Sequence, residues 1–294
     1  MATPSQWVAG ARPRTLPAAV APVVLGTAAA VRVGAAHVGL AVLALLVALA
    51  LQVAVNYAND YSDGVRGTDE VRAGPVRLVG QRLAEPRVVK RAAFAAFGVA
   101  GVAGLALVVL SSAWVMLPLG ALAVLAAWRY TGGTNPYGYR GLGEVYVFVF
   151  FGLMATLGTE YTQAGAVSWF GLAGAVGVGA VASAILVGNN LRDIPTDTEH
   201  GKRTLAVRLG DERTRSLYVE LLGASVLALA VMAAWQPWAL LGLVAAPLAA
   251  RGVRVVRSGT TGPALVPVIA STSLYEVAYA VLVLAGVAVG TALG

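Results

Sequence analysis

Long apolar stretches separated by short polar segments run along the whole chain. Most are about 20 residues long, the length that an α-helix needs to cross the hydrocarbon core of a bilayer. Nine stretches can be recognised, at 17–35, 38–58, 91–111, 113–128, 144–160, 166–190, 216–234, 237–250 and 268–291. Each stretch is continuous, whereas a barrel strand alternates apolar and polar positions. The pattern predicts an all-α polytopic membrane protein with about nine transmembrane helices.

The composition agrees with a membrane protein. The 294 residues are 58% hydrophobic and 12% charged, with a mean hydropathy of +0.76, whereas soluble domains carry about 25% charged residues. The first apolar stretch contains small residues, "VLGTAAA", and could be read as a signal peptide, but the eight further spans need no cleavable leader. No linker divides the chain, which predicts one domain over residues 1–294. The absence of cysteine excludes disulfides and thiolate metal sites.

The basic residues define an orientation. Of the 21 Lys and Arg residues, all except Arg32 fall in segments on one side of the predicted membrane. The positive-inside rule makes that side cytoplasmic, together with the N-terminus. We therefore expect a multi-pass protein of the cell membrane. The net charge of +7 follows from this topology, so nucleic-acid binding is not expected.

An acidic stretch, "NYANDYSDGVRGTDEVRAGP", directly follows the second apolar run and covers residues 56–75. Asn56, Asp60 and Asp63 stand at i, i+4 and i+7, so they share one face of a helix. The glycines that follow are expected to end this helix and to leave Asp69 on the loop.

A second acidic stretch, "NNLRDIPTDTEHGKRTLAVRLG", follows the sixth apolar run at residues 189–210. Asn189, Asp193 and Asp197 stand at i, i+4 and i+8. Pro195 disfavours helix at the residue before it, so the helix is expected to break between the two aspartates. Both acidic stretches lie on the same side of the membrane and can face each other.

Placing a carboxylate in the membrane has an unfavourable free energy of about 2.5–3.5 kcal/mol at the middle of a helix. Such a group therefore needs a cation or a metal ion that compensates for its charge. Aspartate and asparagine oxygens without His or Cys suit hard cations, and Mg²⁺ in particular binds one or two carboxylates and the phosphates of a substrate. Basic residues flank both stretches: Arg66, Arg72, Arg77, Lys202 and Arg203. The pattern predicts a membrane-embedded Mg²⁺ site for a diphosphate ester.

A third segment on the same side, "WRYTGGTNPYGYRGLGE" at residues 128–144, is rich in glycine and tyrosine. If the diphosphate leaves an allylic chain, the remaining carbon is cationic, and aromatic faces can stabilise it. Six tyrosines are expected near this surface: Tyr57, Tyr61, Tyr130, Tyr137, Tyr139 and Tyr146.

These motifs resemble the UbiA-type intramembrane aromatic prenyltransferases. That family has nine helices and two aspartate-rich motifs, Asn-Asp-x-x-Asp-x-x-x-Asp and Asp-x-x-x-Asp, after the second and sixth helices. In this chain, Asn59-Asp60-Tyr-Ser-Asp63 resembles the first motif, and Asp193-Ile-Pro-Thr-Asp197 resembles the second. The last aspartate of the first motif is replaced by Gly67, and Asp69 follows two residues later.

Further segments look like the branch that prenylates 1,4-dihydroxy-2-naphthoate in menaquinone synthesis. They are "ARPRTLPAAVAPVVLGTA", "NDYSDGVRGTD", "GPVR", "YTGG", "GLGE" and "NNLRDI…GKRTLAVRLG", and they cover residues 11–210. The resemblance implies helices around a central cavity, with polyprenyl diphosphate, 1,4-dihydroxy-2-naphthoate and membrane lipid as partners. It also implies Mg²⁺ dependence and replacement of the naphthoate carboxyl by the polyprenyl chain, with release of CO₂ and diphosphate.

The expected site combines both lines of reasoning. The expected metal ligands are Asp60, Asp63, Asp69, Asp193 and Asp197, all except Asp69 also being catalytic. The expected substrate-binding residues are Asn56, Asn59, Arg72, Arg77, Tyr139, Arg140, Asn189, Lys202 and Arg203. Arg12 and Arg14 either hold the acceptor carboxylate or merely anchor the first span.

Two alternatives remain open. One is a UbiA-type transferase with another acceptor, such as a hydroxybenzoate. The other is a cation-coupled transporter with acids on broken helices, although here the acids lie at the cytoplasmic mouth rather than at the midplane. Neither the prenyl chain length nor the oligomeric state can be read from the pattern.

Overall fold

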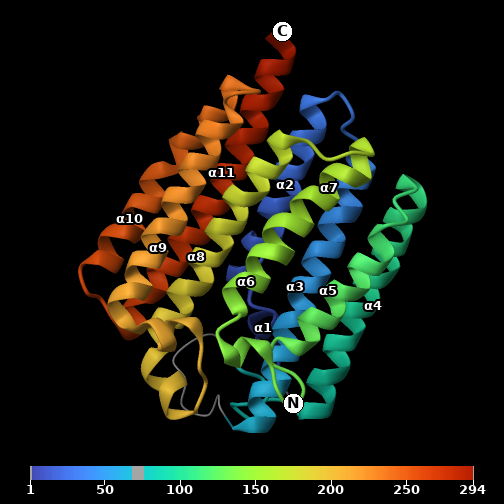
Figure 1. The fold of residues 1–294 in the computed structure, drawn as a ribbon. Coiled ribbons are helices and arrows are strands. Elements are labelled where there is room, and N and C mark those ends of the chain that lie inside the picture. The colour runs from blue at the N-terminus through green and yellow to red at the C-terminus, as the bar shows by residue number, and fades with distance from the viewer. Residues whose placement is uncertain (1, 68–75, 294) are drawn as a thin grey trace.

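The computed structural model describes residues 2–67 and 76–293, and within these ranges it contains helices and turns but no β-strand (Figure 1). Asp69 and Arg72, both expected in the site, lie outside the described residues. A short helix α1 (Pro4–Gly10) precedes the bundle. The longer elements are α2 (Pro17–Arg32), α3 (Val38–Arg66), α4 (Pro86–Ser111), α5 (Met116–Arg129), the run α6–η3–α7 (Gly143–Ala164), α8 (Trp169–Glu199), α9 (Leu205–Met232), the run η4–α10 (Pro237–Arg257) and α11 (Val266–Leu293).

In the described part of the chain, seven helices are long and apolar enough to cross a membrane. The number rises to eight if the bent pair Pro4–Thr15 and Pro17–Arg32, which meet at 49°, forms one span. Helix α5 is apolar but has only 14 residues. The predicted class, an all-α integral membrane protein, is confirmed, and the number nine is approximate.

Helix α8 is the central helix of the bundle. Its apolar window is 78% buried, compared with 28–33% for the other spans, so most of its surface faces protein rather than lipid. Helices α2, α9 and α11 pack around it through one hydrophobic cluster. Small residues allow the backbones to approach: a Cβ on Gly152 would lie 2.5 Å from the Cα of Gly179 in α8.

The two aspartate-bearing helices continue beyond the predicted apolar runs. Helix α3 ends at Arg66, where Gly67 adopts a left-handed conformation (φ 74°) that favours glycine. This position is the one at which the family motif places its last aspartate, and the cap explains why a glycine suits it here. The α3 helix therefore carries the first acidic stretch as far as Asp63 on regular helical turns.

The predicted break between Asp193 and Asp197 is wrong. Helix α8 continues through Pro195 to Glu199. Proline disturbs the preceding turn, but here it stands one turn before the helix end, and packing of α8 against α9 overrides the local preference. The hydroxyl of Thr196 also donates a hydrogen bond to the Asp193 carbonyl (3.0 Å). The two aspartates therefore lie one turn apart on one helical face.

The contact between η3 and α8 makes a prediction about stability. Replacing Gly152 with Val places a Cβ 2.5 Å from backbone of Gly179, and backbone atoms cannot move aside without separating the helices. We expect Gly152→Val to lower the free energy of unfolding by about 1–3 kcal/mol, measured as a lower Tm in detergent. Gly98→Val is the matched control, because a Cβ at Gly98 meets nothing within 4 Å. Equal Tm values for both variants would contradict this interpretation.

Candidate active site

A polar cavity of about 260 Å³ lies at the end of the bundle that carries both acidic stretches. The C-terminal parts of α3 and α8 supply its acids and amides, and the segments around residues 130–139 and 202–204 close it. Nine of the expected site residues line it: Asn56, Asn59, Asp63, Arg77, Tyr139, Asn189, Asp193, Asp197 and Lys202. The fold thus brings together Asp63 and Asp193, which are 130 residues apart in the chain.

Asp63 is held by groups from two other segments. Its Oδ1 accepts a hydrogen bond from the Tyr139 hydroxyl at 2.6 Å, and its Oδ2 lies 3.5 Å from the Nζ of Lys202. The same ammonium lies 4.5 Å from the centre of the Tyr139 ring, which is a cation–π contact. Both Asp63 and Lys202 are buried, so this pairing compensates for loss of water around each charge.

Asp193 has a different cationic partner. The guanidinium of the neighbouring Arg192 donates two hydrogen bonds to it, at 2.7 and 2.8 Å. Asp197, one turn further along α8, is also buried and lines the cavity. Its backbone carbonyl accepts the N–H of Lys202 (2.8 Å), which fixes the start of the segment that carries the lysine.

The donor set of the cavity suits Mg²⁺. Carboxylates and side-chain amides offer hard oxygen ligands, and no soft ligand competes because the chain has no cysteine. Among the described residues, no three His, Cys, Asp or Glu side chains converge as a ready cage for one ion. Mg²⁺ usually takes one or two carboxylates in proteins and completes its shell with water and substrate phosphate.

The polar face of α3 also anchors the N-terminal segment. The amide of Asn56 donates to the Ala11 carbonyl (2.9 Å) and to the Thr15 hydroxyl (3.0 Å), and Gln52 donates to the same hydroxyl (2.9 Å). Between these anchors Arg12 takes a left-handed conformation (φ 54°) and lines the cavity. The α3 helix thus fixes the backbone on both sides of this arginine.

A row of aromatic rings leads out of the polar cavity. Tyr130 meets Tyr137 edge-on at 5.5 Å, Tyr137 stacks on Tyr146 at 3.7 Å, and Tyr146 stacks on Phe150 at 6.0 Å between ring centres. Burial, together with the neighbouring phenols, raises the pKa of Tyr137, so its ring stays neutral. The row therefore offers several electron-rich faces along one side of the cavity.

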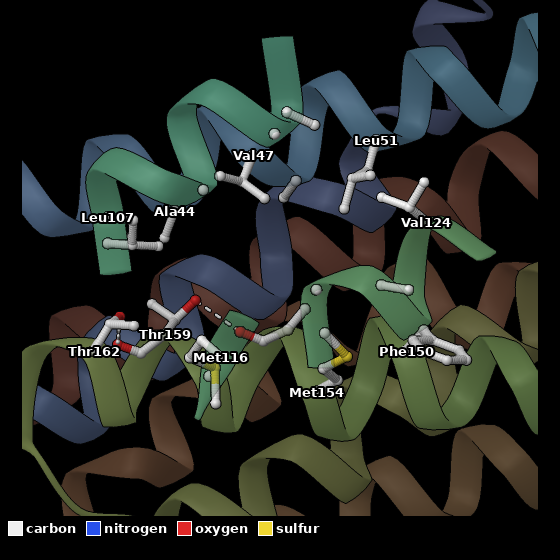
Figure 2. A pocket seen from close by; sticks show the side chains of 18 of the residues that line it. Ala44, Val47, Leu51, Leu107, Met116, Val124, Phe150, Met154, Thr159 and Thr162 are labelled. Atoms are coloured by element: carbon white, nitrogen blue, oxygen red, sulfur yellow. Dashed lines mark hydrogen bonds between the residues drawn. The ribbon is translucent and has the colours of Figure 1, made fainter. Parts of the chain in front are cut away.

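An apolar cavity of about 370 Å³ adjoins the polar one, between α3, α4, α5 and α7 (Figure 2). The two cavities share four lining residues: Val55, Ala123, Phe150 and Phe151. Figure 2 shows Leu51, Val124 and Phe150 near one end and Leu107 and Thr162 near the other. The wider turn of the π-helix η3 (Phe148–Met154) presents two consecutive phenylalanines to the cavities.

Several expected residues lie elsewhere. Asp60 is fully buried outside the polar cavity and accepts backbone N–H groups. Arg140 and Arg203 are exposed and do not line the cavity either. Of the six tyrosines, Tyr57 donates to the Trp7 carbonyl and Tyr61 stacks on Trp128, away from the cavity lining.

Some lining residues were missed by the sequence reasoning. Gln52 stands four residues before Asn56, so the helical spacing of this acidic stretch could have included it. Asn190 also lines the cavity, where its amide donates to Glu144 at 2.8 Å. Thr131 belongs to the "YTGG" segment of the family resemblance, but its partner could not be predicted, because the hydrogen bond from its hydroxyl to Asn59 at 2.7 Å joins residues 72 positions apart.

A polar cavity with acids and bases, joined to an apolar cavity inside a membrane bundle, defines a class of protein that handles a ligand with a charged head and a long apolar tail. Residues 19–264 match the UbiA prenyltransferase family, and the chain belongs to that family.

Relatives support this membership over nearly the whole chain. The 1,4-dihydroxy-2-naphthoate octaprenyltransferase of Mycobacterium tuberculosis is 56% identical, over 99% of this chain and 99% of its own. The protein of the same name from Mycobacterium leprae is also 56% identical, over 96% of each chain. A solved UbiA homolog from Archaeoglobus fulgidus, bound to GPP and Mg²⁺, superposes with a TM-score of 0.64 over 95% of this chain and 99% of that one. At 16% identity this last likeness shows the shared fold.

The anchoring of the N-terminal segment can be tested without substrate. Asn56→Leu leaves the Ala11 carbonyl without its donor, so we expect the segment to detach locally at a cost of about 1–3 kcal/mol. Trypsin should then cut after the exposed Arg14 faster than in the wild type. Gln52→Leu is the graded control, because within the described residues the Gln52 side chain donates a hydrogen bond to the Thr15 hydroxyl and none to the backbone, so its loss should cause a smaller increase. Unchanged cleavage in both variants would count against the anchor.

Proposed function

We propose that this protein transfers a polyprenyl chain from polyprenyl diphosphate to 1,4-dihydroxy-2-naphthoate, with loss of CO₂ and diphosphate, to give demethylmenaquinol for menaquinone synthesis. Residues 1–294 act as one transferase domain. The geometric observation that carries the proposal is the shared wall of the polar and apolar cavities, because two such cavities side by side fit a diphosphate joined to a long hydrocarbon. The names of the two mycobacterial relatives supply the acceptor.

The donor lies across both cavities. Its diphosphate occupies the polar cavity near Lys202 and Arg77, whose charges complement phosphate oxygens. Its chain follows the row of rings to Phe150 and enters the apolar cavity between α3 and α5. Burial of each further methylene there contributes about 0.8 kcal/mol of binding, which favours long chains over short ones.

Asp63 on α3 and the pair Asp193 and Asp197 on α8 would hold separate Mg²⁺ ions, each through one or two carboxylates, with Asn59 and Asn189 beside them in the cavity. The archaeal homolog bound to Mg²⁺ supports this part of the proposal. When bound, Mg²⁺ neutralises the charge that develops on the departing diphosphate. Lys202 and Arg192 now pair with the aspartates, and they are placed to turn toward the phosphates when the carboxylates bind metal.

The reaction begins with cleavage of the bond between the first prenyl carbon and the diphosphate oxygen. The faces of Tyr137 and Tyr146 stabilise the allylic cation and exclude water from it. The carboxyl-bearing carbon of the dihydroxynaphthoate ring attacks that cation, and CO₂ leaves as aromaticity returns. Arg12, which lines the same cavity, binds the acceptor carboxylate, whereas Arg14 and Arg140 are exposed.

The protein lies in the cell membrane with the polar cavity opening toward the cytoplasm. The support is the placement of the basic residues, because all except Arg32 belong to segments on that side. Water-soluble acceptor and Mg²⁺ then reach the cavity from the cytoplasm, and the lipid-like donor and product stay within the bilayer.

A mass spectrum of the products formed by purified protein tests the proposed function. We expect incubation with Mg²⁺, 1,4-dihydroxy-2-naphthoate and a mixture of prenyl diphosphates to give the prenylated, decarboxylated quinol, with long chains preferred. Product formed only from hydroxybenzoate would replace the proposed acceptor. Ion uptake into proteoliposomes without diphosphate release would instead support a transporter.

The metal assignment predicts a shift in Mg²⁺ dependence. Asp63→Asn and Asp193→Asn each remove a charged ligand, so activity should fall by about 10²-fold or more at ordinary Mg²⁺ and recover partly at high Mg²⁺. Asp211→Asn is the matched control, because Asp211 is exposed on α9, away from the cavity lining, and forms an ion pair with Arg215. Intact transfer in either cavity variant at ordinary Mg²⁺ would overturn this assignment.

A further inference from the structure

Asp60 stands in the same acidic stretch as Asp63, but it has a different environment. It is fully buried and is not among the residues that line the polar cavity. Its Oδ2 accepts the backbone N–H of Leu78 at 2.7 Å, and its Oδ1 accepts that of Val79 at 3.1 Å. Both carboxylate oxygens are therefore committed to two consecutive amides, which are charge-assisted hydrogen bonds.

Those two amides begin a compact turn. The N–H of Gln81 bonds to the Arg77 carbonyl at 3.0 Å, and the N–H of Leu83 bonds to the Leu78 carbonyl at 2.8 Å. The first N–H groups of such a turn have no partner within it, as at the start of a helix. Asp60 supplies that partner from α3, so it caps the turn across a gap of 18 residues in the sequence.

Two glycines allow the turn to pack closely against α1 and α3. A Cβ on Gly64, one helical turn after Asp60, would lie 2.5 Å from the Val79 side chain. A Cβ on Gly10 in α1 would lie 2.9 Å from Leu78, which is itself fully buried. Carboxylate and glycines together leave little freedom for the turn to shift between α1 and α3.

The residue directly before this turn is Arg77, a buried arginine that lines the polar cavity with Asp63. We propose that Asp60 is a positioning residue rather than a metal ligand: it fastens the turn that starts at Leu78 and thereby holds Arg77 in place for the diphosphate. This inference rests on the proposed function for the identity of the phosphate ligand. Within one acidic stretch, Asp63 binds the metal ion and Asp60 positions Arg77.

The two hydrogen bonds between Asp60 and the turn can be tested by a structural measurement that does not depend on enzyme activity. In Asp60→Asn the side-chain amide faces one of the two backbone N–H groups, so a hydrogen bond is replaced by repulsion. Hydrogen exchange at the Leu78 and Val79 amides should accelerate by about tenfold or more. Asp63→Asn, which leaves both bonds intact, should leave their exchange unchanged.

The functional readout separates positioning from metal binding. Asp60→Asn should weaken binding of inorganic diphosphate and raise KM for the donor by about tenfold, with the Mg²⁺ midpoint unchanged. Arg77→Gln should give a similar loss, and the double variant should be no worse than Arg77→Gln alone, because Asp60 acts through Arg77. A shifted Mg²⁺ midpoint in Asp60→Asn, or additive losses in the double variant, would overturn the proposal.

A second variant covers the case in which Asp60→Asn fails to fold. Gly64→Ala pushes the turn away through Val79 but leaves every carboxylate in place, so it should reproduce the weaker diphosphate binding. Gly98→Ala is its control, since a Cβ there meets no neighbour. Normal diphosphate binding in Gly64→Ala would contradict the proposal that the turn positions Arg77. Absence of prenyl transfer in the wild type would instead refute the proposed function, because the exchange and diphosphate measurements need neither donor nor acceptor.

Discussion

The requirement that buried charge be compensated governs this end of the bundle. Asp63 and Lys202 are both buried within a membrane protein, and each would be costly alone. Their pairing, completed by the hydroxyl and ring of Tyr139, connects α3 to two segments that come much later in the chain. The same constraint explains the bidentate bond between Arg192 and Asp193 on α8. In the proposed function, these ion pairs keep both aspartates compensated whenever the metal ion and the diphosphate are absent.

The rest of the bundle places a polar environment around the aspartates next to an apolar cavity. Helix α8 is almost enclosed by protein, which fixes the position of its aspartates, whereas α3, α4 and α5 leave space for an apolar cavity between them. The row of rings from Tyr130 to Phe150 lies where the two environments meet. In the proposed reaction, an allylic cation formed at that boundary would be surrounded by aromatic faces rather than by water, which would favour transfer to the acceptor over hydrolysis.

Much of the fold could be predicted because membrane helices are strongly patterned. The continuous apolar runs locate the helices, although α3 and α8 end eight and nine residues later than predicted and α9 begins eleven residues earlier. The family resemblance grouped Asp63, Asp193 and Asp197 in one expected site, and all three line the polar cavity. The errors came where local preference met packing. Pro195 predicted a break, but α8 remains helical. The proline stands near the end of the helix, and the packing of α8 against its neighbours outweighs the hydrogen bond that the proline removes.

The sequence by itself determined the class of the protein, its helices and the residue types of its site, because each depends on hydrophobicity and short-range periodicity. It could not distinguish Asp60 from Asp63, since both are aspartates on neighbouring positions of one helix. Only the tertiary structure decided that Asp60 faces the amides of Leu78 and Val79 and that Asp63 faces the cavity. Long-range contacts also bring Arg12 into the lining of the polar cavity, leave Arg14 exposed and form the apolar cavity. These features depend on which segments meet in space, and no local pattern contains that information.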